Sequence, residues 1–240
     1  TYDLRHWSGH RPILTTDDAD PAETELAGLT PFRYGSLTMG LLWVQHREHG
    51  TLELQLACSR DGVTWTRVGD RQPILSGDAG AFDQQGVQRA TAPIVVDNEL
   101  WFYYAGAAAT LHRRQDPAYQ IGLATLTVDR FVALEAGEEE GTVTTTVLTC
   151  GDQTHLLLNA VVNPGGSLLT EVLDTAGVPL AGFTREDALP FEGNSTYQRI
   201  TWRKEQDLRA LAGQSIHFRF ILRRAALYAF RLAHPNARAS

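Results

Sequence analysis

The residues best suited to ligand chemistry are arginines that stand beside aromatic or amide side chains. Arg33 lies in Phe32-Arg33-Tyr34, and Arg89 follows Gln88. Arginine presents a fork of N–H donors that suits a sugar or a carboxylate, and an aromatic ring can stack on the apolar side of a sugar. With two basic residues of a later connection, the predicted substrate-binding set is Arg33, Tyr34, Gln88, Arg89, His112 and Arg113. The alternatives are ion pairs for Arg33 and Arg89 and an exposed polar loop around His112.

Asp83 is the candidate that the pattern offers for acid chemistry. It follows Phe82 in a loop rich in glycine and aspartate. Cleavage of a glycosidic bond needs two carboxylates, about 5 Å apart for retention or roughly 6.5–9.5 Å apart for inversion. Sequence gives no such distances, and a role in capping the loop is the alternative for Asp83. The catalytic residues therefore stay open.

Neither a metal nor a cofactor is predicted. Asp17-Asp18-Ala19-Asp20 could ligate a hard cation through carboxylate oxygens, but an exposed acidic turn before Pro21 explains the same pattern. His155 and His217 lie in strand-like segments without a partner at metal-binding spacing. The chain also contains no nucleophile elbow, phosphate loop or dinucleotide fingerprint.

Composition narrows the range of partners. The 240 residues are 43% hydrophobic and carry a formal net charge of −7, which disfavours nucleic acid because phosphate binding needs clustered Lys and Arg. No apolar run approaches the roughly 18 residues of a membrane span. No signal segment begins the chain, so either there is none or processing removed it, and a secreted or periplasmic location stays open. Cys58 and Cys150 lie in strand-like surroundings, which favours buried free thiols over a disulfide.

Tryptophan spacing indicates an internal repeat. Trp7 and Trp65 are 58 positions apart (65 − 7), and so are Trp43 and Trp101 (101 − 43). Two pairs at one offset, with several strand signals in each unit, suggest the blades of a β-propeller.

The strands of the first half follow from period-2 alternation and turn residues. Leu52, Leu54 and Leu56 alternate with polar residues, and Asp61-Gly62 supplies a turn, after which Trp65 can fold back onto the hairpin. We predict strands at 32–37, 41–46, 52–59 and 64–68, and then at 87–89, 94–96, 100–104, 121–126 and 131–134.

Beyond an acidic, glycine-flanked run at 135–141 the 58-residue pattern stops, and we place the domain boundary between residues 137 and 138. Further strands are predicted at 143–150, 155–162, 168–173, 197–202, 216–222 and 227–232, with turns at 163–166 and 174–177 and a short helix at 206–211. About 100 residues with six to eight strands fit a β-sandwich.

The predicted fold is therefore all-β, with part of a propeller over residues 1–137 followed by a β-sandwich over residues 138–240. Two or three blades cannot close a ring, and propellers have typically four to eight. We expect an N-terminal segment or a second chain to supply the other blades of a probable five.

Ser59-Arg60-Asp61-Gly62-Val63-Thr64-Trp65 resembles a shortened Asp-box, the turn of sialidase-type propellers. Phe82-Asp83, 92–96, 99–106 and 121–124 are similar in style to five-bladed invertase-like and arabinanase-like glycosidases. A sandwich after the propeller is what glycoside hydrolase family 32 implies. That family's three acidic motifs have no clear match here. Arg114-Gln115-Asp116-Pro117 has one residue more than an Arg-Asp-Pro motif and falls within a connection.

Three functions remain. The first is part of a glycoside hydrolase-like enzyme that acts on glycosidic bonds, with some acids outside this chain. The second is a non-catalytic carbohydrate-binding module, and the third is a scaffold that binds protein. The side chains that line the central channel of the propeller distinguish these functions. Paired acids together with aromatic residues there favour the enzyme, and aromatic residues without paired acids favour the binding module. Small apolar side chains in the channel, or a broad apolar patch, favour the scaffold.

Overall fold

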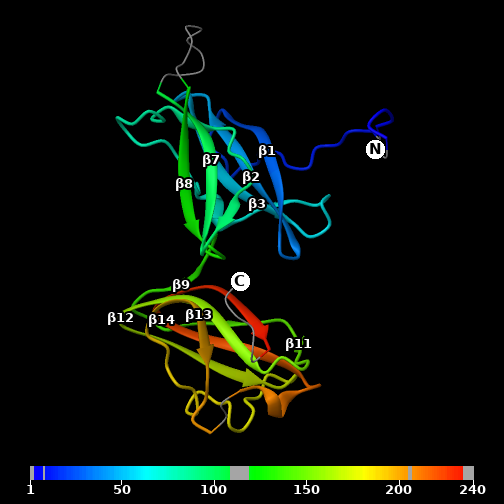
Figure 1. The fold of residues 1–240 in the computed structure, drawn as a ribbon, viewed down its shortest axis with the longest axis vertical. Coiled ribbons are helices and arrows are strands. Elements are labelled where there is room, and N and C mark those ends of the chain that lie inside the picture. The colour runs from blue at the N-terminus through cyan, green and yellow to red at the C-terminus, as the bar shows by residue number, and fades with distance from the viewer. Residues whose placement is uncertain (1–2, 8, 109–118, 205–206, 235–240) are drawn as a thin grey trace. The chain divides into compact units, whose positions relative to one another are not determined.

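The computed structural model describes residues 3–7, 9–108, 119–204 and 207–234 (Figure 1). The chain divides into two compact units, Thr1–Val128 and Asp129–Ser240, and both are built almost entirely from β-strands. The predicted all-β fold is confirmed, with one open sheet in each unit. In the described part of the chain, no helix is long and apolar enough to cross a membrane.

The first half of unit 1 is an antiparallel set of four strands, β1 (Thr24–Tyr34), β2 (Leu37–His46), β3 (Thr51–Ser59) and β4 (Thr66–Arg67). The strand predicted at 32–37 is misplaced, because Gly35 adopts φ +56° and turns the chain there. Leu52, Leu54 and Leu56 are buried, as their alternation predicted. A short 3₁₀ turn, η1 (Gly69–Arg71), follows β4.

The second half of unit 1 contains β5 (Gly86–Gln88), β6 (Ile94–Val96), β7 (Glu99–Ala107) and β8 (Tyr119–Thr127). β5 and β6 pair with the two ends of β7 on one side, and β8 pairs along its other side. One parallel bridge, from Leu52 to Gly86, joins β3 to β5. The sheet order is β1-β2-β3-β5-β7-β6, with β4 on β3 and β8 on β7.

The two halves also pack face to face. Leu41 and Leu54 from the first half line one small cavity together with Phe102 and Leu126 from the second. Trp43 and Trp101 each lie on a strand that is paired on both sides, β2 between β1 and β3 and β7 between β6 and β8.

The other tryptophan pair is not equivalent, which corrects the repeat at its N-terminal end. Trp7 is 73% exposed and lies in no strand. Trp65 instead packs over β2, where a Cβ atom at Gly40 would come within 2.9 Å of its ring.

Unit 2 is organised by two long strands, β12 (His155–Leu173) and β14 (Ser215–Ala233), which pair along their length. The turn predicted at 163–166 does not end a strand. It forms an irregularity in the pairing between Val162 and Ser167, with Gly165 at φ +77°. Strand residues from both sides of this irregularity, such as Leu158 and Val172, face one hydrophobic core.

The remaining strands of unit 2 flank this pair. β13 (Gly193–Ile200) pairs with β12, and β9 (Leu134–Ala136), β10 (Gly141–Thr144) and β11 (Leu148–Thr149) pair with β14. The prediction that 131–134 completes the second repeat is therefore wrong. The predicted short helix is a single 3₁₀ turn, η2 (Arg209–Leu211). Both cysteines are free, and burial raises the pKa of the Cys150 thiol.

Candidate functional site

Strand β5 carries two of the predicted binding residues to the edge of a cavity. Gly86 lies between β3 and β7 with φ +146°, and a Cβ atom there would come within 2.7 Å of the Leu52 backbone nitrogen. Glycine therefore allows β5 to approach β3 closely. Two residues later the chain places Gln88 opposite Ala105 of β7.

The cavity beside β5 has a volume of about 330 Å³ and is lined by Gln88, Arg89, Ala105 and Tyr119. Arg89 is exposed and adopts φ +46°, a left-handed conformation that is uncommon for residues other than glycine. Backbone strain of this kind often accompanies ligand-binding positions. The guanidinium, amide and phenol groups give the cavity hydrogen-bond donors and acceptors and one aromatic ring. Among the lining residues that the structure describes there is no carboxylate.

Asp83 lies on the opposite side of β7 and is closed to solvent. Its carboxylate accepts a hydrogen bond from the Tyr104 hydroxyl at 2.7 Å, and the residue is 4% exposed. Burial, together with this hydrogen bond, raises the pKa of Tyr104 to about 12. Phe82 stacks on the Tyr104 ring, and Gly106 leaves the space that the loop side chains fill. In this position Asp83 ties its loop to β7.

The other predicted binding residues do not join the cavity. Arg33 and Tyr34 lie on β1, which β2 and β3 separate from β5, and the Arg33 guanidinium donates to the Thr38 hydroxyl at 3.1 Å. His112 and Arg113, and the Arg114–Pro117 motif, lie outside the described residues.

The turn at 59–65 is held by one carboxylate. Asp61 accepts hydrogen bonds from the backbone N–H groups of Val63 and Thr64, at 2.8 and 2.7 Å, and from the hydroxyls of Thr64 and Ser59. These bonds hold the pKa of Asp61 well below its usual range. The carboxylate is fully engaged in shaping the turn.

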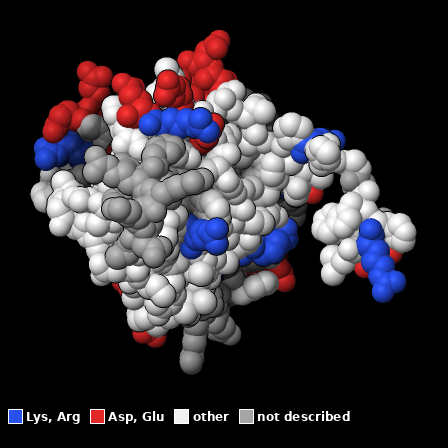
Figure 2. All heavy atoms as spheres, turned by 90° about the horizontal axis from the view of Figure 1, so that it is seen from above, with Lys and Arg blue, Asp and Glu red and all other residues white. Residues whose placement is uncertain are grey.

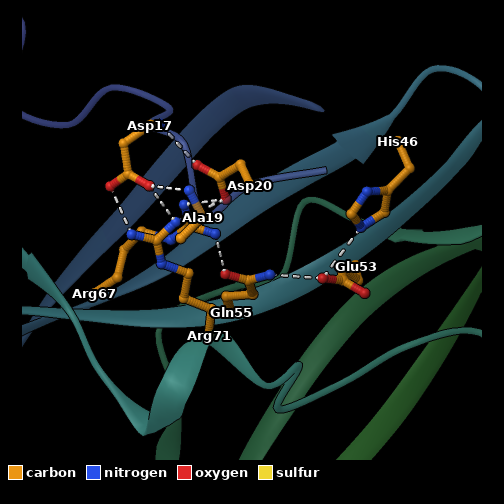
Figure 3. A network of polar contacts seen from close by, with 8 residues as sticks. All are labelled: Asp17, Ala19, Asp20, His46, Glu53, Gln55, Arg67 and Arg71. Carbon is orange, nitrogen blue, oxygen red and sulfur yellow. Dashed lines mark hydrogen bonds and ion pairs between the residues drawn. The ribbon is translucent and has the colours of Figure 1, made fainter. Parts of the chain in front are cut away.

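The acidic turn at 17–20 is bound by two arginines (Figure 3). The Arg71 guanidinium donates to both carboxylate oxygens of Asp17, at 2.8 and 2.6 Å. Arg67 donates to Asp20 at 2.6 Å, and the two side chains are only 6% and 3% exposed. The carboxylates thus have cationic partners, and the described residues contain no group of three or more His, Cys, Asp or Glu that could hold a metal.

The network continues into the sheet. Arg67 also donates to the Gln55 side-chain oxygen at 2.6 Å, and the Gln55 amide donates to Glu53 at 2.7 Å. Glu53 in turn lies 3.3 Å from His46. Figure 3 shows these side chains joined across β2, β3 and the 17–20 turn, so the network fastens the turn to the sheet.

Charged side chains form no broad basic surface on the face shown in Figure 2. Lys and Arg side chains there lie scattered among uncharged ones, and Asp and Glu side chains gather along one edge.

Sequence reasoning missed Ala105 and Tyr119 as cavity residues. Both are brought to the site by strand pairing. Ala105 of β7 lies opposite Gln88 of β5, and Tyr119 of β8 lies opposite Ala107 of β7. An aromatic residue at the start of a strand was the only sequence signal for Tyr119.

Comparison with known proteins gives limited similarity. No protein-family model and no curated protein sequence matches this protein. A solved structure of BT0996 in complex with RGII is 19% identical over 50% of this protein and 37% of its own length, with a TM-score of 0.41.

Two further solved structures are a glycoside hydrolase family 43 arabinoxylan arabinofuranohydrolase from Bacillus subtilis in complex with cellotetraose and a sucrose-6-phosphate hydrolase from Lactobacillus gasseri. The first is 10% identical, with a TM-score of 0.26, over 86% of this protein and 53% of its own length. The second is 11% identical, with a TM-score of 0.25, over 91% of this protein and 68% of its own length. The protein spans only about a third of the first two structures that it matches, 37% and 34% of their lengths. Identities and TM-scores this low assign no family and no activity.

Proposed function

We propose that this chain is part of a carbohydrate-active, glycoside hydrolase-like protein and that the cavity beside β5 binds a sugar. Residues 1–128 would be the last blades of a propeller, and residues 129–240 the sandwich that follows. The observation that carries the proposal is a cavity of about 330 Å³ that joins the Arg89 guanidinium, the Gln88 amide and the Tyr119 phenol. Ligand pockets commonly have volumes of about 300–1,000 Å³, so this one suits a single sugar unit.

The chemistry of these side chains suits neutral hydroxyl groups. The amide of Gln88 can donate and accept, the Arg89 guanidinium donates to hydroxyl or carboxylate oxygens, and the Tyr119 ring can stack on a sugar face. Tyr119 is 50% exposed, so its ring is available to a ligand.

Hydrolysis would require acids from outside this cavity. A glycosidase needs a pair of carboxylates on either side of the bond. Asp83 is buried against Tyr104, and we assign it a structural role. Within this chain the proposed role is therefore binding, and the enzymatic reaction would depend on blades supplied by a further segment or chain.

Calorimetric titration tests the proposal. The panel is a set of fructosides, arabinosides and sialosides together with RGII, which the first solved structure names as part of its complex. Each is also incubated with the protein to detect released sugar. We expect binding of at least one of these sugars and no turnover. A protein that binds none of them, or one that hydrolyses them unaided, would contradict the proposal.

Variants locate the binding site. Arg89→Asn keeps a residue that tolerates the left-handed backbone, and it should weaken binding about 10- to 100-fold, as the loss of a hydrogen bond from a charged donor does. Arg33→Asn is the matched control, since Arg33 lies on β1 away from the cavity. If Arg33→Asn weakened binding and Arg89→Asn did not, the site would lie elsewhere.

A further inference from the structure

Three arginines in the described part of the chain adopt left-handed backbone conformations, and two of them bind a carboxylate. Arg71, at φ +60°, donates to both side-chain oxygens of Asp17. The guanidinium of Arg224, at φ +48°, lies 3.1 Å from the Glu138 carboxylate. Arg89, at φ +46°, differs from both, since its side chain makes no hydrogen bond or ion pair with any residue that the structure describes.

The backbone around Arg89 is fixed although its side chain is exposed. Gln88 is paired with Ala105 of β7, and Ala90 is 3% exposed, so Arg89 is held between two anchored neighbours. A left-handed conformation is unfavourable for a residue with a Cβ atom, and glycine or asparagine would adopt it more easily. Strain of this kind is typical of positions that act on a ligand. The fixed backbone thus presents the Arg89 guanidinium to the cavity beside β5.

The described lining of this cavity contains one charged side chain, which is that of Arg89. Asp83 is the nearest acidic residue along the chain, but it is 4% exposed and its carboxylate accepts from Tyr104. Consecutive residues of a strand point to opposite faces, so Tyr104 and the cavity residue Ala105 face opposite sides of β7. The positive charge of Arg89 is therefore not neutralised within the cavity.

We infer that the sugar bound beside β5 carries a carboxylate, as a uronic acid does, and that Arg89 binds this group. This extends, and rests on, the proposed function of the cavity, since it adds the chemical class of the sugar. The planar guanidinium presents two parallel N–H donors that match the two oxygens of a carboxylate. Gln88 and Tyr119 are then available to the ring hydroxyls and to the apolar face of the sugar.

A carboxylate matches the cavity better than a phosphate group does. A phosphate monoester carries nearly two negative charges at neutral pH, and phosphate sites commonly add several backbone N–H donors at the start of a helix. Here one arginine lies at the end of a short strand, and the other described lining side chains are uncharged. A single guanidinium balances the single charge of a uronic acid.

Calorimetric titration with matched sugars tests this inference. The pairs are the methyl glycosides of glucuronic acid and glucose and those of galacturonic acid and galactose, with the methyl ester of each uronic acid and glucose 6-phosphate as further probes. We expect at least one uronic acid to bind about 10- to 100-fold more tightly than its neutral partner, as hydrogen bonds between charged groups allow. Its methyl ester, which has lost the charge, should bind like the neutral sugar, and the phosphate should bind more weakly than the uronic acid.

Two variants assign the preference to one side chain. Arg89→Asn retains a residue that tolerates the left-handed backbone, and it should bind the acidic and neutral members of a pair equally. Arg33→Asn is the matched control and should keep the full preference, because β2 and β3 separate Arg33 from the cavity. Thermal unfolding of both variants checks that each is folded.

The possible failures can be told apart. Neutral sugars that bind as tightly as the uronic acids would overturn the assignment of a carboxylate and leave the proposed sugar site standing. A preference that survives in Arg89→Asn, or tighter binding of glucose 6-phosphate than of either uronic acid, would also overturn it. Absence of binding by every probe would overturn the proposed function and the carboxylate together.

Discussion

Removal of Arg67 should destabilise unit 1 more than removal of Arg71, the other arginine that binds the acidic turn at 17–20. Its guanidinium bonds to Asp20 and Gln55, both at 2.6 Å, and its side chain is 6% exposed. Arg67→Met keeps the apolar stem but leaves the Asp20 carboxylate, which is 3% exposed, with Arg71 at 3.2 Å as its remaining cationic partner. Loss of one partner of a buried ion pair costs about 3–5 kcal/mol, and the remaining arginine places the expected cost near the lower end, about 3 kcal/mol.

Differential scanning calorimetry converts that cost into temperature. Unfolding entropy is about 2.1 cal/mol/K per residue, so a unit of about 130 residues has roughly 270 cal/mol/K, and about 3 kcal/mol lowers Tm by about 11 °C. Unit 2 contains none of these residues and serves as the internal reference. Arg71→Met is the matched control, and it should lower Tm much less, because Arg71 is more exposed and its main partner Asp17 faces solvent.

A double-mutant cycle separates the ion pair from simple loss of packing. Asp20→Asn alone should destabilise the unit, but Asp20→Asn with Arg67→Met should cost at least about 1 kcal/mol less than the sum of the single variants, since coupled residues are non-additive. Additive costs, or an Arg67→Met variant within about 1 kcal/mol of the wild type, would refute the inference that this network stabilises unit 1 by fastening the 17–20 turn to the sheet.

Three further outcomes follow from the same structure. The pKa of Tyr104 is raised to about 12, above the value of about 10 in an unfolded chain, so its contribution to stability should be complete below about pH 10 and lost as pH rises through 12. Absorbance titration should show one late tyrosine, and its absence would contradict this. Hydrogen bonding to Arg71 lowers the pKa of Asp17 to about 2, so its contribution should be present above about pH 4 and lost as pH falls through 2, and Asp17→Asn should remove that acid dependence in unfolding curves. Gly86→Ala should destabilise unit 1 by about 1–3 kcal/mol in urea unfolding, whereas Gly9→Ala, where a Cβ atom meets nothing within 4 Å, should not.

Local patterns predicted the strands well where one face alone decides burial. The alternation of Leu52, Leu54 and Leu56 placed β3 correctly, but Gln55 is also buried, at 4% exposure. Its burial depends on Arg67, which lies twelve positions further along the chain on the neighbouring strand. Apolar–polar alternation considers only the residues of one strand, so a partner on the neighbouring strand, and with it the polar network, was not predicted.

Glycine and proline predicted chain reversals less reliably than apolar–polar alternation predicted strands. Gly35 ends β1, whereas the Asn163-Pro164-Gly165-Gly166 run only interrupts the pairing of β12 with β14. The difference lies in what the chain does next. After Gly35 the chain reverses beside its own strand, but after Gly166 it continues along the same neighbour, which only the long-range pairing with residues 217–223 determines.

The candidate site was predicted in part for the same reason. Gln88 and Arg89 are adjacent in sequence and share the cavity, but Arg33 was grouped with them only because it too is an arginine beside aromatic residues. The sheet order instead leaves two strands between β1 and β5. Ala105 and Tyr119 reach the cavity through registers across β7, and registers between distant strands are not encoded in local patterns.

Asp83 shows how a buried acidic residue can hold in place the strand that carries the residues of the proposed binding site. Its carboxylate accepts from Tyr104 of β7, and its backbone carbonyl accepts from the N–H of Gly86 at 2.7 Å, at the start of β5. Gly77 lies so close to the Asp83 carbonyl that any side chain there would collide with it. The loop is thus fixed on the side of β7 that Tyr104 faces. Gln88 of β5 instead pairs with Ala105, whose side chain lies on the other side of β7. Asp83 thus ties its loop to β7 through its carboxylate and to the start of β5 through its backbone carbonyl, and β5 carries two of the cavity residues, although Asp83 itself is closed to solvent.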